Sequence, residues 1–217
     1  MSTWTSRAGF SGRIGRPGLA LGLVLFLGGC LGEGSGQGGG FFEALSTRAP
    51  EAEPLGRAKL AGGQVIVAGP TGYCVDPSSL DARPSGGFAL IGACSALGST
   101  EPWQEPVVMT VQVQRRPSRQ APPDAQALAE AVAPLRVISQ EDGEGISLVQ
   151  LAEGGDAALP GSDPRHWRGT MMINDHTVAL SLYAPEGSGA AGRDGRTLLI
   201  AFAEAILEAS PVRDQSE

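Results

Sequence analysis

The sequence predicts an α+β fold: an antiparallel β-sheet with a middle helix and a C-terminal helix packed on one face. Short β-branched runs and segments of alternating polarity follow one another along the chain, with turn residues between them. Helical periodicity occurs in two segments, one in the middle and one near the end. Because short turns join strands that pair antiparallel, these observations favour an antiparallel sheet with helices packed against it.

The first strands are marked by β-branched runs and by the turn residues that end them. Val65–Ala68 is a β-branched run that stops at Gly69-Pro70, a turn signal. We expect residues 72–75 to be extended and residues 88–96 to form a buried strand. Apolar and polar residues alternate through residues 107–114, which indicates a strand with one buried face.

A helix is predicted from Asp124 onward, because apolar residues then recur at intervals of three and four. These residues are Leu128, Ala131, Val132 and Leu135. Pro134 limits the helix at its end. Two further strands are expected near residues 136–139 and 146–151.

A β-hairpin and a final helix complete the predicted fold. Residues 167–173 and 177–183 have strand character, and Asn174-Asp175 between them is a turn signal. The last helix is expected over residues 194–209, and Pro211 stops it. Its apolar stripe consists of Leu198, Phe202, Ala205, Ile206 and Ala209.

This order of elements loosely resembles the PsbP-like fold of the photosystem II extrinsic protein, in which paired strands run into a C-terminal helix that covers the sheet. The similarity rests on element order and on no motif. It implies a domain of a kind used mainly for binding and assembly, which leaves the role of any one member open.

The first 29 residues have the features of a signal peptide. The part before residue 19 contains Arg7, Arg13 and Arg16 and no acidic residue, and residues 19–27 form a short apolar core. This core has the length of a signal-peptide h-region and is too short to span a membrane comfortably as a helix. The sequence therefore predicts export.

The apolar core runs into Leu27-Gly28-Gly29-Cys30, a leucine and two small residues before a cysteine. This tetrapeptide resembles the lipobox of bacterial lipoproteins. The resemblance implies a diacylglyceryl group on the Cys30 sulfur, cleavage before Cys30 and acylation, for example by palmitate, of the new N-terminus. Two or three acyl chains anchor a protein stably where one does not. The alternative is an ordinary signal peptide or an uncleaved helix in which Cys30 is incidental.

The predicted domain organisation follows from this anchor. Residues 30–62 form the lipidated cysteine and a flexible tether, because their Gly- and Pro-rich composition makes ordered structure costly in backbone entropy. A single α+β domain is expected over residues 63–211, with a disordered tail at 212–217. We expect the protein in the cell envelope, facing the periplasm. Leu31, in place of the Asp that retains lipoproteins at the inner membrane, favours the outer membrane.

The charge of the chain argues against nucleic acid as a partner. Formal net charge is −7, and loss of the three arginines before Cys30 would make it −10. A surface of this sign is repelled by phosphate backbones. The expected partners are the membrane, through the lipid on Cys30, and a protein of the envelope.

Cys74 and Cys94 remain once Cys30 is assigned to the lipid. Both lie on expected strands, and an exported protein meets an oxidising compartment, so a structural disulfide is predicted. Two free buried thiols are the alternative. Redox or metal chemistry is disfavoured because the sequence has no C-x-x-C and no third ligand nearby.

No motif in the sequence indicates catalysis, a cofactor or a metal. Residues 187–192 match G-x-G-x-x-G, but the following helix is the last element, so a flexible loop is predicted. His166 and His176 lie near opposite ends of the expected hairpin without metal-ligand spacing, and we expect both to be exposed turn residues. Glu141, Asp142 and Glu144 are expected to form a solvated loop.

These observations favour a non-enzymatic, lipid-anchored envelope protein whose domain binds a partner or assists assembly. The alternative is a small periplasmic hydrolase or ligand-binding enzyme with a site assembled non-locally. A deep pocket that holds a histidine beside a carboxylate and a serine would favour the enzyme, and a flat sheet face would favour the binding module.

Overall fold

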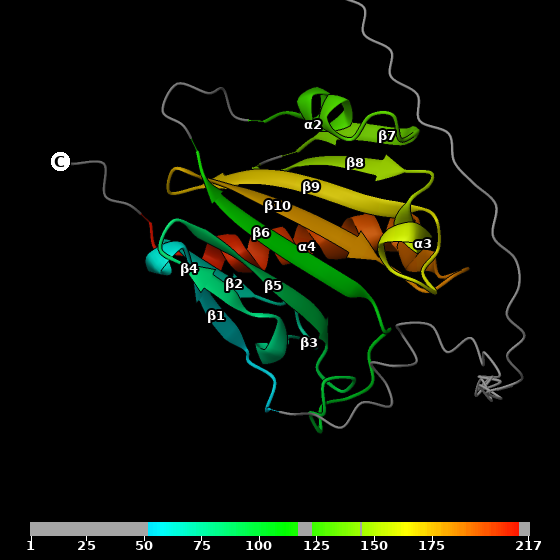
Figure 1. Cartoon of the computed structure of the whole chain (residues 1–217). Coiled ribbons are helices and arrows are strands. Elements are labelled where there is room, and N and C mark those ends of the chain that lie inside the picture. The colour runs from blue at the N-terminus through cyan, green and yellow to red at the C-terminus, as the bar shows by residue number, and fades with distance from the viewer. Residues whose placement is uncertain (1–51, 117–122, 144, 213–217) are drawn as a thin grey trace, which may run out of the picture. The chain divides into compact units, whose positions relative to one another are not determined.

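An antiparallel sheet of eight strands forms the centre of this computed structural model, which describes residues 52–116, 123–143 and 145–212 (Figure 1). The strand order is β3-β5-β6-β10-β9-β8-β7, and β4 pairs with β5 beside β3. The strands are β3 (Tyr73–Val75), β4 (Asp81–Arg83), β5 (Gly86–Ala93), β6 (Val108–Arg115), β7 (Val137–Asp142), β8 (Ser147–Leu151), β9 (His166–Ile173) and β10 (His176–Tyr183).

A separate hairpin and three α-helices surround the sheet within these described ranges. The hairpin pairs β1 (Arg57–Leu60) with β2 (Val65–Ala68). The helices are α2 (Ala125–Ala131), α3 (Gly155–Ala158) and α4 (Arg193–Ala209), and short 3-10 turns cover Ala61–Gly63, Pro77–Ser79 and Gly189–Ala191. The predicted fold class is confirmed.

The hydrophobic core lies between one face of the sheet and α4, which runs behind the sheet in Figure 1. Alternate residues of the central strands point into this core, so that Val111, Leu180 and Leu182 are buried against Phe202 of α4. The helix also packs on β2, and the Ser210 hydroxyl that follows it accepts a hydrogen bond of 3.0 Å from Ile66 N–H. We call this side of the sheet the covered face.

The two predicted helices divide between the two faces, which corrects the expectation that both pack on one face. Leu148 points into the core beneath α4, and its neighbour Ser147 therefore points to the other side of β8. There the Ser147 hydroxyl contacts the carbonyl of Pro123, just before α2. Helix α2 packs on β7 and β8 at one edge of this second face (Figure 1).

The ordered structure begins earlier than the sequence predicts. Residues 55–62 fall within the expected tether of residues 30–62, yet Leu55 exchanges backbone hydrogen bonds of 3.0 and 2.8 Å with Val75. Strand β1 then pairs with β2, and Leu60 is fully buried. The domain boundary predicted at residue 63 is therefore too late.

Cys74 of β3 and Cys94, directly after β5, form the predicted disulfide, with Cα atoms 4.9 Å apart. Cys94 N–H also donates to the carbonyl of Gly72 at 2.9 Å. The bond closes a loop across the outer edge of the sheet and ties β3 to β5.

Cys30, the signal peptide and most of the predicted tether lie outside the described residues. No helix within the described ranges has both the length and the apolarity to cross a membrane.

Candidate functional site

The second face of the sheet is left partly uncovered where β5, β6 and β10 lie side by side. We call this region the open face and define it by Phe88, Leu90, Thr110, Gln112 and Ala179. The register aligns these residues in rows, since Phe88 pairs with Gln112 and Gln112 with Ala179, while Leu90 pairs with Thr110. Gln112 and Ala179 are exposed, and Phe88 and Leu90 are half-buried. The region is an accessible surface of mixed polarity.

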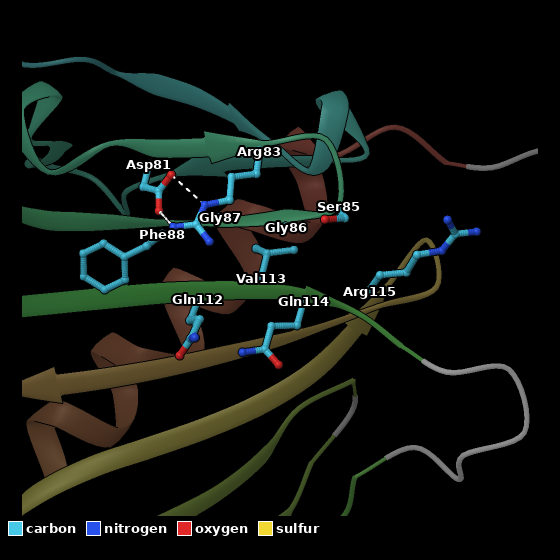
Figure 2. A pocket seen from close by; sticks show the side chains of 10 residues that line it. All are labelled: Asp81, Arg83, Ser85, Gly86, Gly87, Phe88, Gln112, Val113, Gln114 and Arg115. Atoms are coloured by element: carbon cyan, nitrogen blue, oxygen red, sulfur yellow. Dashed lines mark hydrogen bonds and ion pairs between the residues drawn. The ribbon is translucent and has the colours of Figure 1, made fainter.

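Two hollows lie along the open face and share Phe88 and Gln112 as lining residues. The first has a volume of about 420 Å³ and contains Asp81 and Arg83 of β4, which form an ion pair (Figure 2). Figure 2 shows this pair beside Phe88, with Gln112 on the neighbouring strand. The second, of about 290 Å³, lies toward Arg168 of β9, and we call it the Arg168 pocket.

The Arg168 pocket combines one cationic side chain with mostly apolar walls. Its lining residues are Phe88, Leu90, Val108, Thr110, Gln112, Ala158, Leu159, Arg168, Ala179, Ser181 and Tyr183. Arg168 Nη1 donates a hydrogen bond of 2.7 Å to Ser181 Oγ, and its guanidinium carbon lies 5.6 Å from the centre of the Tyr183 ring. These contacts hold the guanidinium at one end of the open face.

His166 lies behind this pocket and is almost completely buried, which corrects the prediction of an exposed turn residue. Its ring stacks on Tyr183 with centroids 5.3 Å apart. Its Nδ1 lies 3.3 Å from the carbonyl of Pro164, while Nε2 is buried without a hydrogen-bond partner among the described residues. Burial, followed by the nearby positive charge of Arg168, lowers the pKa of His166 from 6.5 and favours the neutral ring.

His176 is also buried rather than exposed, at the opposite end of the hairpin from His166 as the sequence predicts. Its Nδ1 lies 2.7 Å from the carbonyl of Asn174. Among the hydrogen bonds of the described residues, neither histidine ring reaches a serine or a carboxylate.

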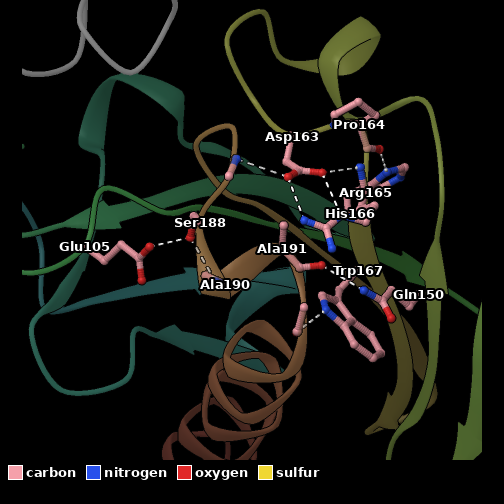
Figure 3. Close-up of polar contacts among 12 residues, drawn as sticks. Glu105, Gln150, Asp163, Pro164, Arg165, His166, Trp167, Ser188, Ala190 and Ala191 are labelled. Atoms are coloured by element: carbon pink, nitrogen blue, oxygen red, sulfur yellow. Dashed lines mark hydrogen bonds and ion pairs between the residues drawn. The ribbon is translucent and has the colours of Figure 1, made fainter.

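The loop of residues 187–192 is held by side chains from several elements, which corrects the prediction of a flexible loop (Figure 3). Ser188 caps the 3-10 turn by accepting from Ala190 N–H, and its hydroxyl donates to a carboxylate oxygen of Glu105. Gln150 donates to the carbonyl of Ala191 at 2.8 Å, and Trp167 Nε1 donates to that of Gly192 at 2.9 Å. The glycine-rich motif therefore serves to seat α4 on the sheet.

Asp163 joins this loop to the start of β9. Its carboxylate accepts two hydrogen bonds from the Arg165 side chain, at 3.0 and 2.9 Å, and one of 3.2 Å from Gly187 N–H (Figure 3). The side-chain hydrogen bond from Arg165 lowers the pKa of Asp163 to about 2, against an opposing effect of burial. Tyr73 lies near Glu105 in the same part of the fold, and burial and the Glu105 charge raise its pKa to about 12.

The carboxylates predicted to lie in a solvated loop are instead on or near strand β7. Glu141 pairs with Arg196 of α4 at 2.6 Å. Asp142 accepts from the Ser147 hydroxyl at 2.6 Å and from Ala125 N–H at 2.8 Å, so it fixes the start of α2, and these hydrogen bonds lower its pKa. Glu144 lies outside the described residues. Within the described ranges, no group of three or more His, Cys, Asp or Glu side chains is placed to hold a metal ion.

Arg168 is the site residue that the sequence does not reveal. The sequence correctly predicts that Arg168 lies in a strand. It does not predict the row of cross-strand neighbours Leu90, Thr110, Ser181 and Arg168, because that row forms only when four strands pair. An arginine inside a segment rich in apolar residues was the available signal, because such a residue is rarely buried without a polar partner.

Comparison with known proteins gives a loose likeness of fold alone. No protein family and no curated protein matches the chain. The Saccharomyces cerevisiae Ran-binding protein Mog1p and a mutant of the protein Mog1 are each 12% identical at a TM-score of 0.44, over 74% of this chain and 96% of theirs. Cyanobacterial PsbP (CyanoP) from Synechocystis sp. PCC 6803 is 11% identical at a TM-score of 0.38, over 77% and 98%. The loose similarity to PsbP expected from element order is thus found, and it is too weak to carry an inference about function.

Proposed function

We propose that this chain is an exported protein, anchored by lipid on Cys30 in the cell envelope, whose α+β domain binds a partner through the open face. The domain holds its partner without transforming it, and the outer membrane is the membrane to which it is attached. The partner is a protein of the envelope.

The lipid anchor is supported by the sequence around Cys30. The signal-peptide features, Leu27-Gly28-Gly29-Cys30 and the Gly-rich stretch after it follow one another in the order that a tethered lipoprotein requires. The described cysteines add support, since Cys74 and Cys94 bond to each other and Cys30 is left over for the lipid.

The binding role is supported above all by the unequal covering of the two sheet faces. Helix α4 and the β1–β2 hairpin pack on the covered face, whereas Phe88, Leu90, Gln112 and Ala179 remain accessible on the open face. Phe88 and Leu90 lie on the same face as the exposed side chains of Gln112 and Ala179, so this face offers a partner both apolar contacts and polar groups. A flexible tether leaves the domain free to turn this surface toward a partner.

The anchor is tested by replacing the acylated sulfur. Cys30→Ser in the full chain should abolish labelling by a palmitate analogue and release the protein from the membrane fraction, because position 30 then has no thiol to receive the diacylglyceryl group. Cys74→Ser is the matched control and should leave labelling unchanged. Labelling that persists in Cys30→Ser would show that Cys30 is not the lipidated residue.

The binding surface is tested by placing a bulky charge on each face. We expect Ala179→Arg, on the open face, to abolish co-purification of the partner from solubilised membranes. Glu204→Arg, at an exposed position of α4 on the covered side, should leave co-purification unchanged. A partner retained equally by both variants, or lost equally from both while each stays folded, would contradict the proposed surface.

A further inference from the structure

We propose that the Arg168 pocket is a subsite for a carboxylate carried on a compact apolar group. This inference rests on the proposed role of the open face as a binding surface, and it adds the chemistry of the ligand. Arg168 holds the carboxylate, and the apolar side chains that line the pocket hold the apolar group.

The charge of Arg168 is not neutralised within the described part of the chain. Each ion pair described there joins other residues: Asp81 with Arg83, Asp163 with Arg165 and Glu141 with Arg196. The chain contains 23 acidic and 16 basic residues, so acidic side chains are in excess. Half-buried charged groups are normally paired with a group of opposite charge. Arg168 has no acidic side chain beside it among the described residues, so an anionic ligand can take that place.

The hydrogen bonding of Arg168 is likewise incomplete. Nη1 donates to Ser181, whereas Nε is buried and has no partner within hydrogen-bond distance among the described residues. Nε is too enclosed to meet a ligand, whereas Nη2 is neither hydrogen-bonded nor fully buried among the described residues, so a carboxylate in the pocket can accept a hydrogen bond from Nη2. The planar guanidinium suits a carboxylate better than it suits a neutral acceptor, because the two form parallel hydrogen bonds.

Arg168 is already held in place for such a ligand. Ser181 lies directly opposite it on β10, and the Tyr183 ring lies under its guanidinium. The His166 ring stacks on the same Tyr183 ring, and this contact helps to hold Tyr183 in place beneath Arg168. Fixing the side chain beforehand lowers the entropy cost of binding.

The walls of the pocket define the other half of the ligand. Leu90, Val108, Leu159 and Ala158 contribute apolar surface, and no acidic side chain is among the lining residues. An apolar group can therefore pack against these walls, whereas Arg168 repels a cationic ligand. The volume of about 290 Å³ restricts the bound group to a small one. The combination favours a carboxylic acid with a compact apolar part.

The test uses hexanoate and its neutral isostere hexanamide, titrated by calorimetry against the full lipidated chain in nanodiscs, with empty nanodiscs as the blank. We expect hexanoate to bind with a Kd on the order of 1 mM, as suits so small a ligand. Hexanamide should bind about tenfold or more weakly, because it fills the same space without the charge.

Arg168→Met keeps the length and apolar character of the side chain and removes its charge. It should weaken hexanoate binding about tenfold or more and leave hexanamide binding unchanged. Arg57→Met, at an exposed position of β1 outside the open face, is the matched control and should bind both probes as the native chain does. Arg168→Lys should recover part of the hexanoate affinity, which shows that a variant at this position can fold and bind.

The outcomes separate the two proposals. Equal binding of hexanoate and hexanamide, no hexanoate binding at 20-fold above the expected Kd (about 20 mM), or undiminished binding to Arg168→Met would each overturn the carboxylate subsite. If the subsite fails while Ala179→Arg still abolishes partner co-purification, the binding surface stands and only the assigned ligand chemistry is lost. If the subsite binds hexanoate as expected while Ala179→Arg leaves co-purification of the partner unchanged, the proposed partner-binding surface is the proposal that fails.

Discussion

The two faces of one sheet differ in what their side chains do. On the covered face, Val111 and Leu180 are buried beneath α4 and belong to a continuous hydrophobic core. Their immediate neighbours Thr110 and Ala179 point to the open face, where polar and half-exposed residues surround a cationic pocket. Because side chains alternate along a strand, the same segments supply stability on one side and a surface for recognition on the other.

The largest expected difference between the faces concerns two phenylalanines. Phe202 is 0% exposed in the core, so Phe202→Ala should lower the free energy of unfolding by about 3–5 kcal/mol. Phe88→Ala on the open face removes a half-exposed ring and should cost less than about 1.5 kcal/mol. Chemical denaturation of both variants measures the comparison. Equal losses would show that the open face is part of the folding core.

The disulfide should contribute the next largest effect, at the edge of the sheet where both faces end. The double substitution Cys74→Ser and Cys94→Ser opens a loop with a sequence separation of 20 residues, which the chain-entropy estimate values at about 3 kcal/mol. Denaturant titration under oxidising conditions measures this loss. If reduction of the disulfide leaves the unfolding midpoint of the native chain unchanged, the bond does not stabilise the fold as predicted.

Much of the fold could be predicted because its strands carry local patterns. The alternation in β6, the turn between β9 and β10 and the apolar stripe of α4 are each visible within one short segment. Strand β1 is not predicted by the sequence, because Arg57 and Lys59 alternate with the buried Ala58 and Leu60 and give the four-residue segment the composition of a polar linker.

The candidate site could not be predicted because it depends on contacts between distant segments. The row that contains Arg168 is assembled from β5, β6, β9 and β10. The burial of His166 depends likewise on Tyr183 of the neighbouring strand, with Gly154 and Leu135 close by. A histidine at the end of a strand reads as exposed until the segments that cover it are known.

The ion pair between Asp163 and Arg165, just before β9, should give a smaller effect that depends on pH. Asp163 has a pKa lowered to about 2 from 3.8, so its contribution is present above pH 3.8 and is lost as the pH falls toward 2. Asp163→Asn should lower stability at pH 7 by about 1–3 kcal/mol, since Arg165 and Gly187 N–H lose a charged acceptor. Unfolding curves of both proteins should converge as the pH approaches 2, and a constant difference down to that pH would contradict the assignment.

The smallest predicted effect concerns His166, behind the Arg168 pocket. Its pKa lies below the unfolded value of 6.5, so the unfolded chain binds a proton first and stability falls as the pH drops below 6.5. Burial and Arg168 favour the neutral ring, whereas Asp156 and the Pro164 carbonyl act in the opposite direction. His166→Phe should flatten the pH dependence between pH 6.5 and the folded-state pKa. An NMR titration that finds His166 with a pKa above 6.5 would be inconsistent with this account.

The claim that the open face binds the partner is tested most directly by photo-crosslinking in intact cells. A photoreactive amino acid is placed at Gln112, exposed on the open face, and separately at Glu204, exposed on α4. The account predicts a discrete adduct of the lipidated protein from position 112 and none from position 204, with the position-112 adduct absent when Ala179→Arg is present. An adduct from position 204 that survives Ala179→Arg, with none from position 112, would contradict it.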